Sequence, residues 1–125
     1  MKLLSLLTTL CLGANAMTHL SFPMKGGNQH LVDPSTGDEF EVSLVSNMTT
    51  GFSWEITDSV GVDLVSHEYV ADVQEEPVTG SGGQDVFRFR VTNQLADGDE
   101  VLKFVYQRPW LKTHEHEASV SVVKQ

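Results

Sequence analysis

The chain has 125 residues, of which 40% are hydrophobic, and its 8 Lys and Arg against 17 Asp and Glu give a formal net charge of −9 at pH 7. This length supports one domain with a modest core, and the acidic balance argues against nucleic acid and anionic membranes as partners. Cys11 is the only cysteine and lies in a segment that we expect to be removed, which excludes a thiol nucleophile, a zinc–thiolate site and a disulfide framework in the mature domain.

The first segment in chain order has the features of a secretory signal peptide. Lys2 provides a basic start, residues 3–12 form an apolar run, and residues 14–16, Ala-Asn-Ala, form a small-x-small cleavage site. The run has only about half of the roughly 20 apolar residues that a membrane span needs. We therefore expect cleavage after Ala16 and a mature domain of residues 17–125, with a charge of 7 − 17 = −10 once Lys2 is lost. Such a protein would be secreted or held in a lysosome-like or vesicular compartment.

Beyond this segment, apolar and polar residues alternate with a period of two, as half-buried strands require. The alternation is clearest over residues 40–44 and 84–91. Further strands are expected at about 53–58, 63–71, 100–107 and 117–124. Turn-rich separators and nearly absent helix signals then predict an all-β fold, an immunoglobulin-like antiparallel β-sandwich of about seven or eight strands. Residues 24–38 are polar and Gly-rich, and the sequence leaves their order open.

The first of three informative segments between predicted strands is Asn47-Met48-Thr49-Thr50-Gly51. Gly51 can adopt a positive φ, and the side chains of Asn47 and Thr49 can hydrogen-bond to nearby backbone, so the turn can support itself. A stiff loop loses little entropy on docking. By itself, however, such a turn is usually only structural.

The second segment, Gly80-Ser81-Gly82-Gly83, contains three glycines. A phosphate-binding loop would need a helix after it, whereas residues 84–91 have the pattern of a strand, so nucleotide binding is excluded. Bare glycine backbone suits an approach to an extended chain or to the wall of a cleft, because no side chain obstructs its N–H and C=O groups.

The third segment is Arg108-Pro109-Trp110, in which a proline restrains the backbone next to a guanidinium and a large aromatic ring. Trp and Arg are the side chains most enriched among interface hot spots, although a tryptophan beside a strand can equally belong to the core. Phe52 and Trp54, two residues apart after the first segment, are expected to face one side of their strand, toward the core.

Signals for a reaction centre are weak. His114 and His116 could share one face of a strand, but two histidines without a third fixed ligand make a poor metal site, and a solvated loop or strand start is favoured. Ser81 lacks the strand-to-helix elbow that exposes a nucleophile. We therefore expect no metal, no cofactor and no enzymatic activity.

In this order and spacing, the three segments resemble the three loops of the chagasin family of cysteine peptidase inhibitors, whose pattern is Asn-Pro-Thr-Thr-Gly, then Gly-x-Gly-Gly, then Arg-Pro-Trp. The resemblance covers essentially the whole mature chain, including Ser53-Trp54 and Val105-Tyr106. It implies an eight-stranded immunoglobulin-like domain, with its inhibitory loops at one end, that reversibly blocks papain-like peptidases of the cathepsin L and B type. We expect such a domain to act as a monomer.

The resemblance also implies roles for the three segments. Thr49 and Thr50 would lie against the catalytic cysteine and histidine of the peptidase, and the turn would offer no carbonyl for attack. The segment 80–83 would pair along the cleft like a substrate strand, and the segment 108–110 would pack on the other side. A rival interpretation is a secreted adhesion or carbohydrate-binding sandwich with Trp54 and Trp110 as ligand platforms.

The chain departs from the family pattern at Met48, which stands where the family has proline. The change frees a φ angle, which can cost about 0.4–1 kcal/mol through the unbound ensemble. It also creates Asn47-Met48-Thr49, an N-glycosylation sequon that proline would block. The resemblance implies that the loop 47–51 enters the active-site cleft of the peptidase, where a glycan on Asn47 would obstruct it. We expect the site to be unmodified or sparsely modified because the turn is tight.

Overall fold

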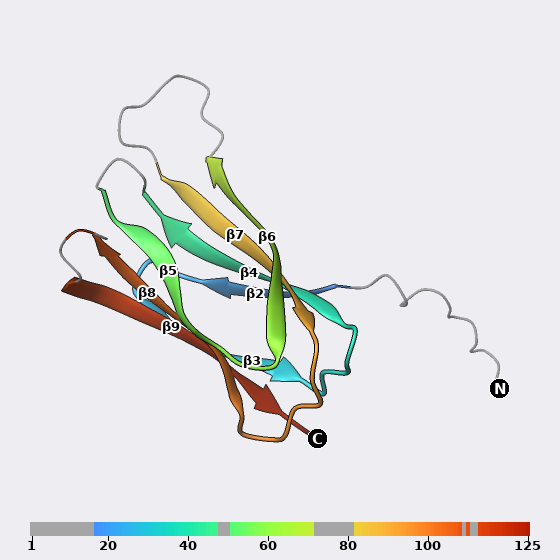
Figure 1. Ribbon diagram of the computed structural model, residues 1–125. Coiled ribbons are helices and arrows are strands. Elements are labelled where there is room, and N and C mark those ends of the chain that lie inside the picture. Colours follow the sequence, from blue (N-terminus) through green and yellow to red (C-terminus); the bar gives the residue numbers. More distant parts are fainter. Residues whose placement is uncertain (1–16, 48–50, 72–81, 109, 111–112) are drawn as a thin grey trace.

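The computed structural model describes residues 17–47, 51–71, 82–108, 110 and 113–125 (Figure 1). The predicted signal segment and several loop residues, namely Met48, Thr49, Thr50, Gly80, Ser81 and Pro109, lie outside the described residues. The described part of the chain contains no helix long and apolar enough to cross a membrane.

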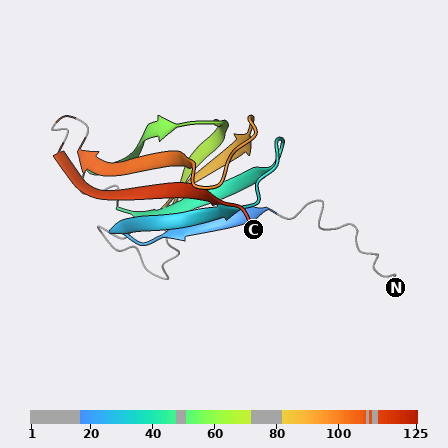
Figure 2. The ribbon, with the colours of Figure 1, turned by 90° about the horizontal axis from the view of Figure 1, so that it is seen from below.

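Eight strands are present within these residues, and they form two four-stranded sheets stacked face to face (Figures 1 and 2). The strands are β2 (Thr18–Phe22), β3 (Gly26–Val32), β4 (Glu39–Ser46), β5 (Ser53–Ser59), β6 (Val62–Ala71), β7 (Gly83–Val91), β8 (Glu100–Arg108) and β9 (Thr113–Val123). The first sheet has the order β2-β4-β7-β6 and the second β3-β9-β8-β5. The predicted all-β sandwich is therefore confirmed.

The sheets are mixed, whereas the sequence predicted an antiparallel sandwich. β2 pairs with β4 in parallel, and β3 pairs with β9 in parallel. The reason is a tight turn after Pro23, closed by a 2.9 Å hydrogen bond from the Gly26 amide, which sends the two strands into different sheets. Each then borders a strand that is distant in sequence. Part of the segment 24–38, whose order the sequence left open, is thus strand β3.

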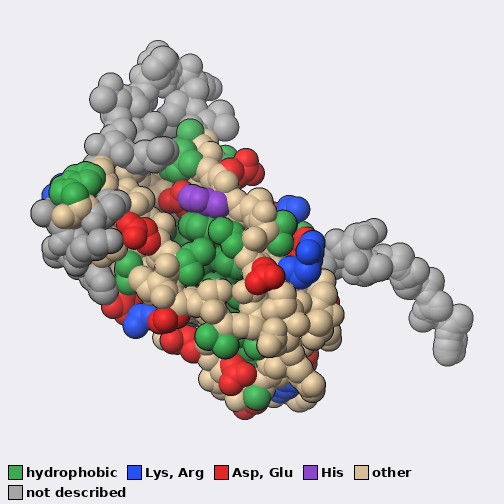
Figure 3. All heavy atoms as spheres, in the orientation of Figure 1, with side chains coloured by type: hydrophobic (Ala, Val, Ile, Leu, Met, Phe, Trp, Pro, Cys, Tyr) green, Lys and Arg blue, Asp and Glu red, His purple; other side chains and the backbone are tan. Residues whose placement is uncertain are grey.

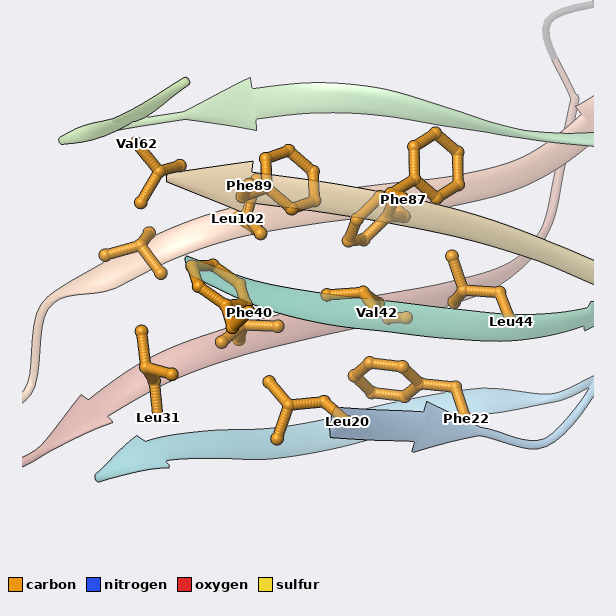
Figure 4. Close-up of a cluster of buried hydrophobic side chains, with 14 of the residues drawn as sticks. Leu20, Phe22, Leu31, Phe40, Val42, Leu44, Val62, Phe87, Phe89 and Leu102 are labelled. Atoms are coloured by element: carbon orange, nitrogen blue, oxygen red, sulfur yellow. The ribbon is translucent and has the colours of Figure 1, made fainter. Parts of the chain in front are cut away.

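The core lies between the sheets and follows the period-two alternation (Figure 4). Phe40, Val42 and Leu44 of β4 are at most 1% exposed, and Phe89 of β7 is fully buried. Phe104 of β8 meets Phe89 from the opposite sheet, with ring centroids 6.2 Å apart. Aromatic rings from both sheets therefore fill the centre, in the edge-to-face and offset arrangements that such rings prefer.

Charged pairs cover the outer face of the first sheet, on the strands whose other face is core. Arg88 donates a 2.8 Å hydrogen bond to Glu41, which also lies 3.0 Å from His19, and Arg90 lies 2.6 Å from Glu39. The pKa of the Glu41 carboxyl is lowered, first by the hydrogen bond from Arg88 and then by the charges of His19 and Arg88, against an opposing effect of burial.

We expect Glu41→Gln to lower the free energy of unfolding slightly at neutral pH and to have no effect in acid. A carboxyl with a depressed folded pKa stabilises the fold above its ordinary pKa of 4.5, and this contribution disappears as pH falls through the lower folded value. The effect is small because the pair is partly exposed and screened. Urea unfolding at neutral pH and in steps below pH 4.5 measures it. The control is Glu100→Gln on the other sheet. If Glu41→Gln still lowered the free energy of unfolding in acid, the ion pair would not be the source of the loss.

One side of the sandwich lies between the edge strands β5 and β6. Hydrophobic side chains show there on the face drawn in Figure 3. Leu64 of β6 is 50% exposed although it pairs in register with the buried Phe89. An edge strand has no neighbour to shield it, so its inward-facing side chains remain partly in contact with water.

Candidate functional site

The strand ends that flank the three motifs gather at one end of the sandwich (Figure 1). This end carries the last residues of β4, β6 and β8 and the first residues of β5, β7 and β9. The three connections between these pairs of strands contain the three motifs. The expectation that the three loops lie at one end of the sandwich is therefore confirmed for the strand ends that carry them, and the grouping follows from the order of the strands in the two sheets.

The first and third motifs are in direct contact through Gly51 and Trp110. Gly51 has φ +83°, a left-handed conformation that side chains resist. A Cβ atom built on Gly51 would lie only 2.8 Å from Cη2 of Trp110 and 3.9 Å from Nε of Arg108. The indole therefore packs on the bare backbone of the first loop, and the positive φ requires glycine there.

Trp110 is 69% exposed, which places its side chain on the surface and not in the core. Its neighbour Arg108 stacks its guanidinium over the ring of Phe52, 4.6 Å from the centroid, a cation–π contact. Phe52 is half-buried and packs against the core cluster. The large exposed ring thus lies against the Gly51 backbone, next to a residue pair that packs on the core cluster, and exposed tryptophans are typical interface anchors.

Two hydrogen bonds that run between the sheets hold the stems of the first loop. Tyr106, on β8 of the second sheet, accepts a 3.2 Å hydrogen bond from the backbone N–H of Asn47, which follows β4 of the first sheet. Trp54, on β5, donates a 2.9 Å hydrogen bond from Nε1 to the carbonyl of Val45. The Tyr106 ring also lies 5.3 Å from Phe52 and 5.0 Å from Trp54.

Trp54 is 3% exposed, so the expectation that it faces the core is confirmed, and it offers no surface as a ligand platform. Sequence reasoning gave Tyr106 no role at the site. The signal was available in the alternation Leu102, Phe104, Tyr106, which ends next to the third motif with a core-facing ring that carries a hydroxyl.

Gly83, of the second motif, lies inside the first sheet. It is buried and pairs in register with Ser46 of β4 on one side and Ala71 of β6 on the other. A Cβ atom there would overlap the carbonyl oxygen of Val70 and lie 2.6 Å from the Tyr69 hydroxyl. The glycine therefore permits Tyr69 to lie across the strand, while the half-buried Gly82 precedes it at the open end.

A buried carboxylate lies just behind the second motif. Asp85 is 8% exposed, and its Oδ1 lies 2.8 Å from Nε2 of His67 on the neighbouring strand. The imidazole stacks flat on Phe87, with centroids 4.1 Å apart and planes 3° from parallel. This hydrogen bond and stack tie β6 to β7 at the base of the second loop.

Within the described residues, no group of three or more His, Cys, Asp and Glu side chains is placed to hold a metal ion. His116, which shares the segment 114–117 with His114, stacks with Tyr106 at a centroid distance of 6.2 Å. It therefore belongs to the aromatic cluster below the first loop.

Comparisons with known proteins agree with this architecture. Residues 33–123 match the family described as chagasin family peptidase inhibitor I42. The chain is 34% identical over 84 residues to amoebiasin-1 of Entamoeba histolytica, covering 66% of this chain and 78% of that protein.

The fold of this chain is similar to that of the cysteine protease inhibitor EhICP2 from Entamoeba histolytica, with a TM-score of 0.61, 19% identity and coverage of 87% and 97% of the two chains. The solution structure of amebosin matches with a TM-score of 0.55 and 27% identity over 86% of this chain and 98% of that one. The chain belongs to the chagasin family of peptidase inhibitors, I42.

Proposed function

We propose that this chain is a reversible, tight-binding inhibitor of papain-like cysteine peptidases that closes their active-site cleft with three loops. Membership of a peptidase-inhibitor family supports inhibition, and the three motifs that resemble chagasin loops support the cysteine peptidase class. The observation that carries the proposal is the exposed Trp110 ring seated on Gly51, with Arg108 beside it, at the end where all three loops emerge.

In this proposal the first loop, 47–51, enters the cleft as a wedge. Attack by the peptidase thiolate needs a carbonyl carbon in line at roughly 3–3.5 Å, and the turn withholds one, so the inhibitor escapes cleavage. The second loop, 80–83, lies along one side of the cleft, and Arg108, Pro109 and Trp110 pack on the other.

Affinity arises from preorganisation without covalent chemistry. The hydrogen bonds at Asn47 and Val45 and the packing of Trp110 on Gly51 hold the loop stems before the peptidase arrives. A surface that is already ordered pays less conformational entropy on association, so more of the contact energy remains as affinity. The chain itself is proposed to catalyse no reaction, and its route is proposed to be the secretory pathway.

The test is a titration of residues 17–125, produced without glycan, against papain and a cathepsin L-type peptidase with a fluorogenic substrate. We expect stoichiometric, reversible loss of peptidase activity and an intact inhibitor after long incubation. Absence of inhibition by correctly folded protein, or steady cleavage of the chain, would overturn the proposal. Intact-mass analysis of natively secreted protein tests whether Asn47 carries a glycan. Full glycosylation of Asn47 with undiminished inhibition would contradict entry of the loop 47–51 into the cleft.

A further inference from the structure

Tyr106 contacts both ends of the first loop. Its hydroxyl accepts the hydrogen bond from the Asn47 amide at the start of the loop, and its ring stacks with Phe52 just beyond the end of the loop. The side chain is 4% exposed, and Trp54 and His116 flank its ring. The position of the hydroxyl is therefore fixed by packing that is independent of any partner.

The Asn47 amide marks the point where the chain leaves the first sheet. The register of β4 with β7 ends at the pair Ser46–Gly83. The next backbone donor, on Asn47, turns to Tyr106 in the opposite sheet. This bond sets the direction in which the loop departs, because it lies on the first residue after the last ladder pair.

The third motif reaches the same loop from the same strand. Arg108, two residues beyond Tyr106, places its guanidinium over the Phe52 ring, and Trp110 lies on Gly51. The end of β8 and the residues after it thus touch the loop at its first residue and at its last.

We propose that Tyr106 is a positioning residue for inhibition, which holds the first loop in the orientation that docks with the peptidase. The proposal rests on the proposed function. Without the hydroxyl, the loop samples other orientations, and only a fraction of the molecules is competent to bind. The apparent affinity falls by that fraction, and the loss lies in the association rate. Loss of a direct contact would instead appear mainly in the dissociation rate.

The experiment compares Tyr106→Phe with the unsubstituted domain, residues 17–125. The substitution keeps the aromatic stack and removes only the hydroxyl. The matched control is Ser59→Ala, since Ser59 donates a side-chain hydrogen bond of the same 3.2 Å length to the backbone carbonyl of Val62 at the opposite end of the sandwich. Stopped-flow inhibition of papain gives both rate constants, and hydrogen exchange of the free protein gives the protection of the Asn47 amide.

We expect the association rate constant of Tyr106→Phe to fall about three- to ten-fold, as the net value of one hydrogen bond implies, with little change in dissociation. Protection of the Asn47 amide should fall in the same variant and stay unchanged in Ser59→Ala. An unaltered association rate, a loss confined to dissociation, or an equal loss in the control would overturn the proposal. If the unsubstituted domain did not inhibit, the proposed function would fail, and exchange at Asn47 would still show whether the hydroxyl holds the loop.

Discussion

Trp110→Ala is expected to raise the dissociation constant for a papain-like peptidase by about 30-fold or more while leaving the fold intact. Hot-spot tryptophans contribute at least about 2 kcal/mol, because they bury a large, rigid surface on binding. The indole is 69% exposed in the free chain, so its removal leaves no cavity in the core. The free energy of unfolding should therefore change by no more than about 0.5 kcal/mol, as for other surface substitutions. Inhibition kinetics and urea unfolding of the same preparation measure the two effects.

The matched control for this substitution is Val60→Ala. Val60 is 60% exposed and lies in the turn between β5 and β6, at the end of the sandwich opposite the three loops. Its truncation removes exposed apolar surface and should leave affinity unchanged. Equal affinity of Trp110→Ala and the unsubstituted protein would contradict the three-loop interface, and equal losses in both variants would point to a general effect of surface hydrophobicity.

Gly83→Ala is expected to destabilise the fold by about 2–3 kcal/mol. The new methyl group would overlap the carbonyl oxygen of Val70 and press on the Tyr69 hydroxyl. A backbone atom of a paired strand cannot give way without separating β6 from β7, and overpacking of this kind costs about 1–3 kcal/mol or more. Urea unfolding measures the loss, and inhibition by the fraction that remains folded tests whether the glycine also contacts the peptidase.

Ser46→Ala serves as the control at the facing position. Ser46 pairs in register with Gly83, is 1% exposed, and its Oγ has no hydrogen-bond partner among the described residues. Removal of an unsatisfied buried hydroxyl should leave stability unchanged or raise it, because no bond is lost. A Gly83→Ala protein as stable as the unsubstituted one would show that β6 relaxes freely. Stability retained with inhibition lost would assign Gly83 to the peptidase contact instead.

Much of the fold could be predicted from the sequence because the alternation of apolar and polar residues within a strand indicates which side chains are buried. Phe40, Val42 and Leu44 alternate with polar residues, and each faces the core because successive side chains point to opposite faces of a strand. The all-β class follows from the same alternation. The parallel pairs that join β2 to β4 and β3 to β9 were not predictable, because local alternation does not identify a strand's partner.

The candidate site shows the same division between local and tertiary information. The motif residues and the need for glycine at turns are properties of short segments, so they and the family resemblance could be read from the sequence. Trp54 follows the first motif and Trp110 ends the third, and the sequence left the environment of Trp110 open between core and surface. The packed fold shows that Trp54 is buried, at 3% exposure, and that Trp110 is 69% exposed. The two environments differ because burial depends on which strands pack above a side chain. The hydrogen bond from Asn47 to Tyr106, which joins residues 59 positions apart, likewise exists only because the two sheets close on each other.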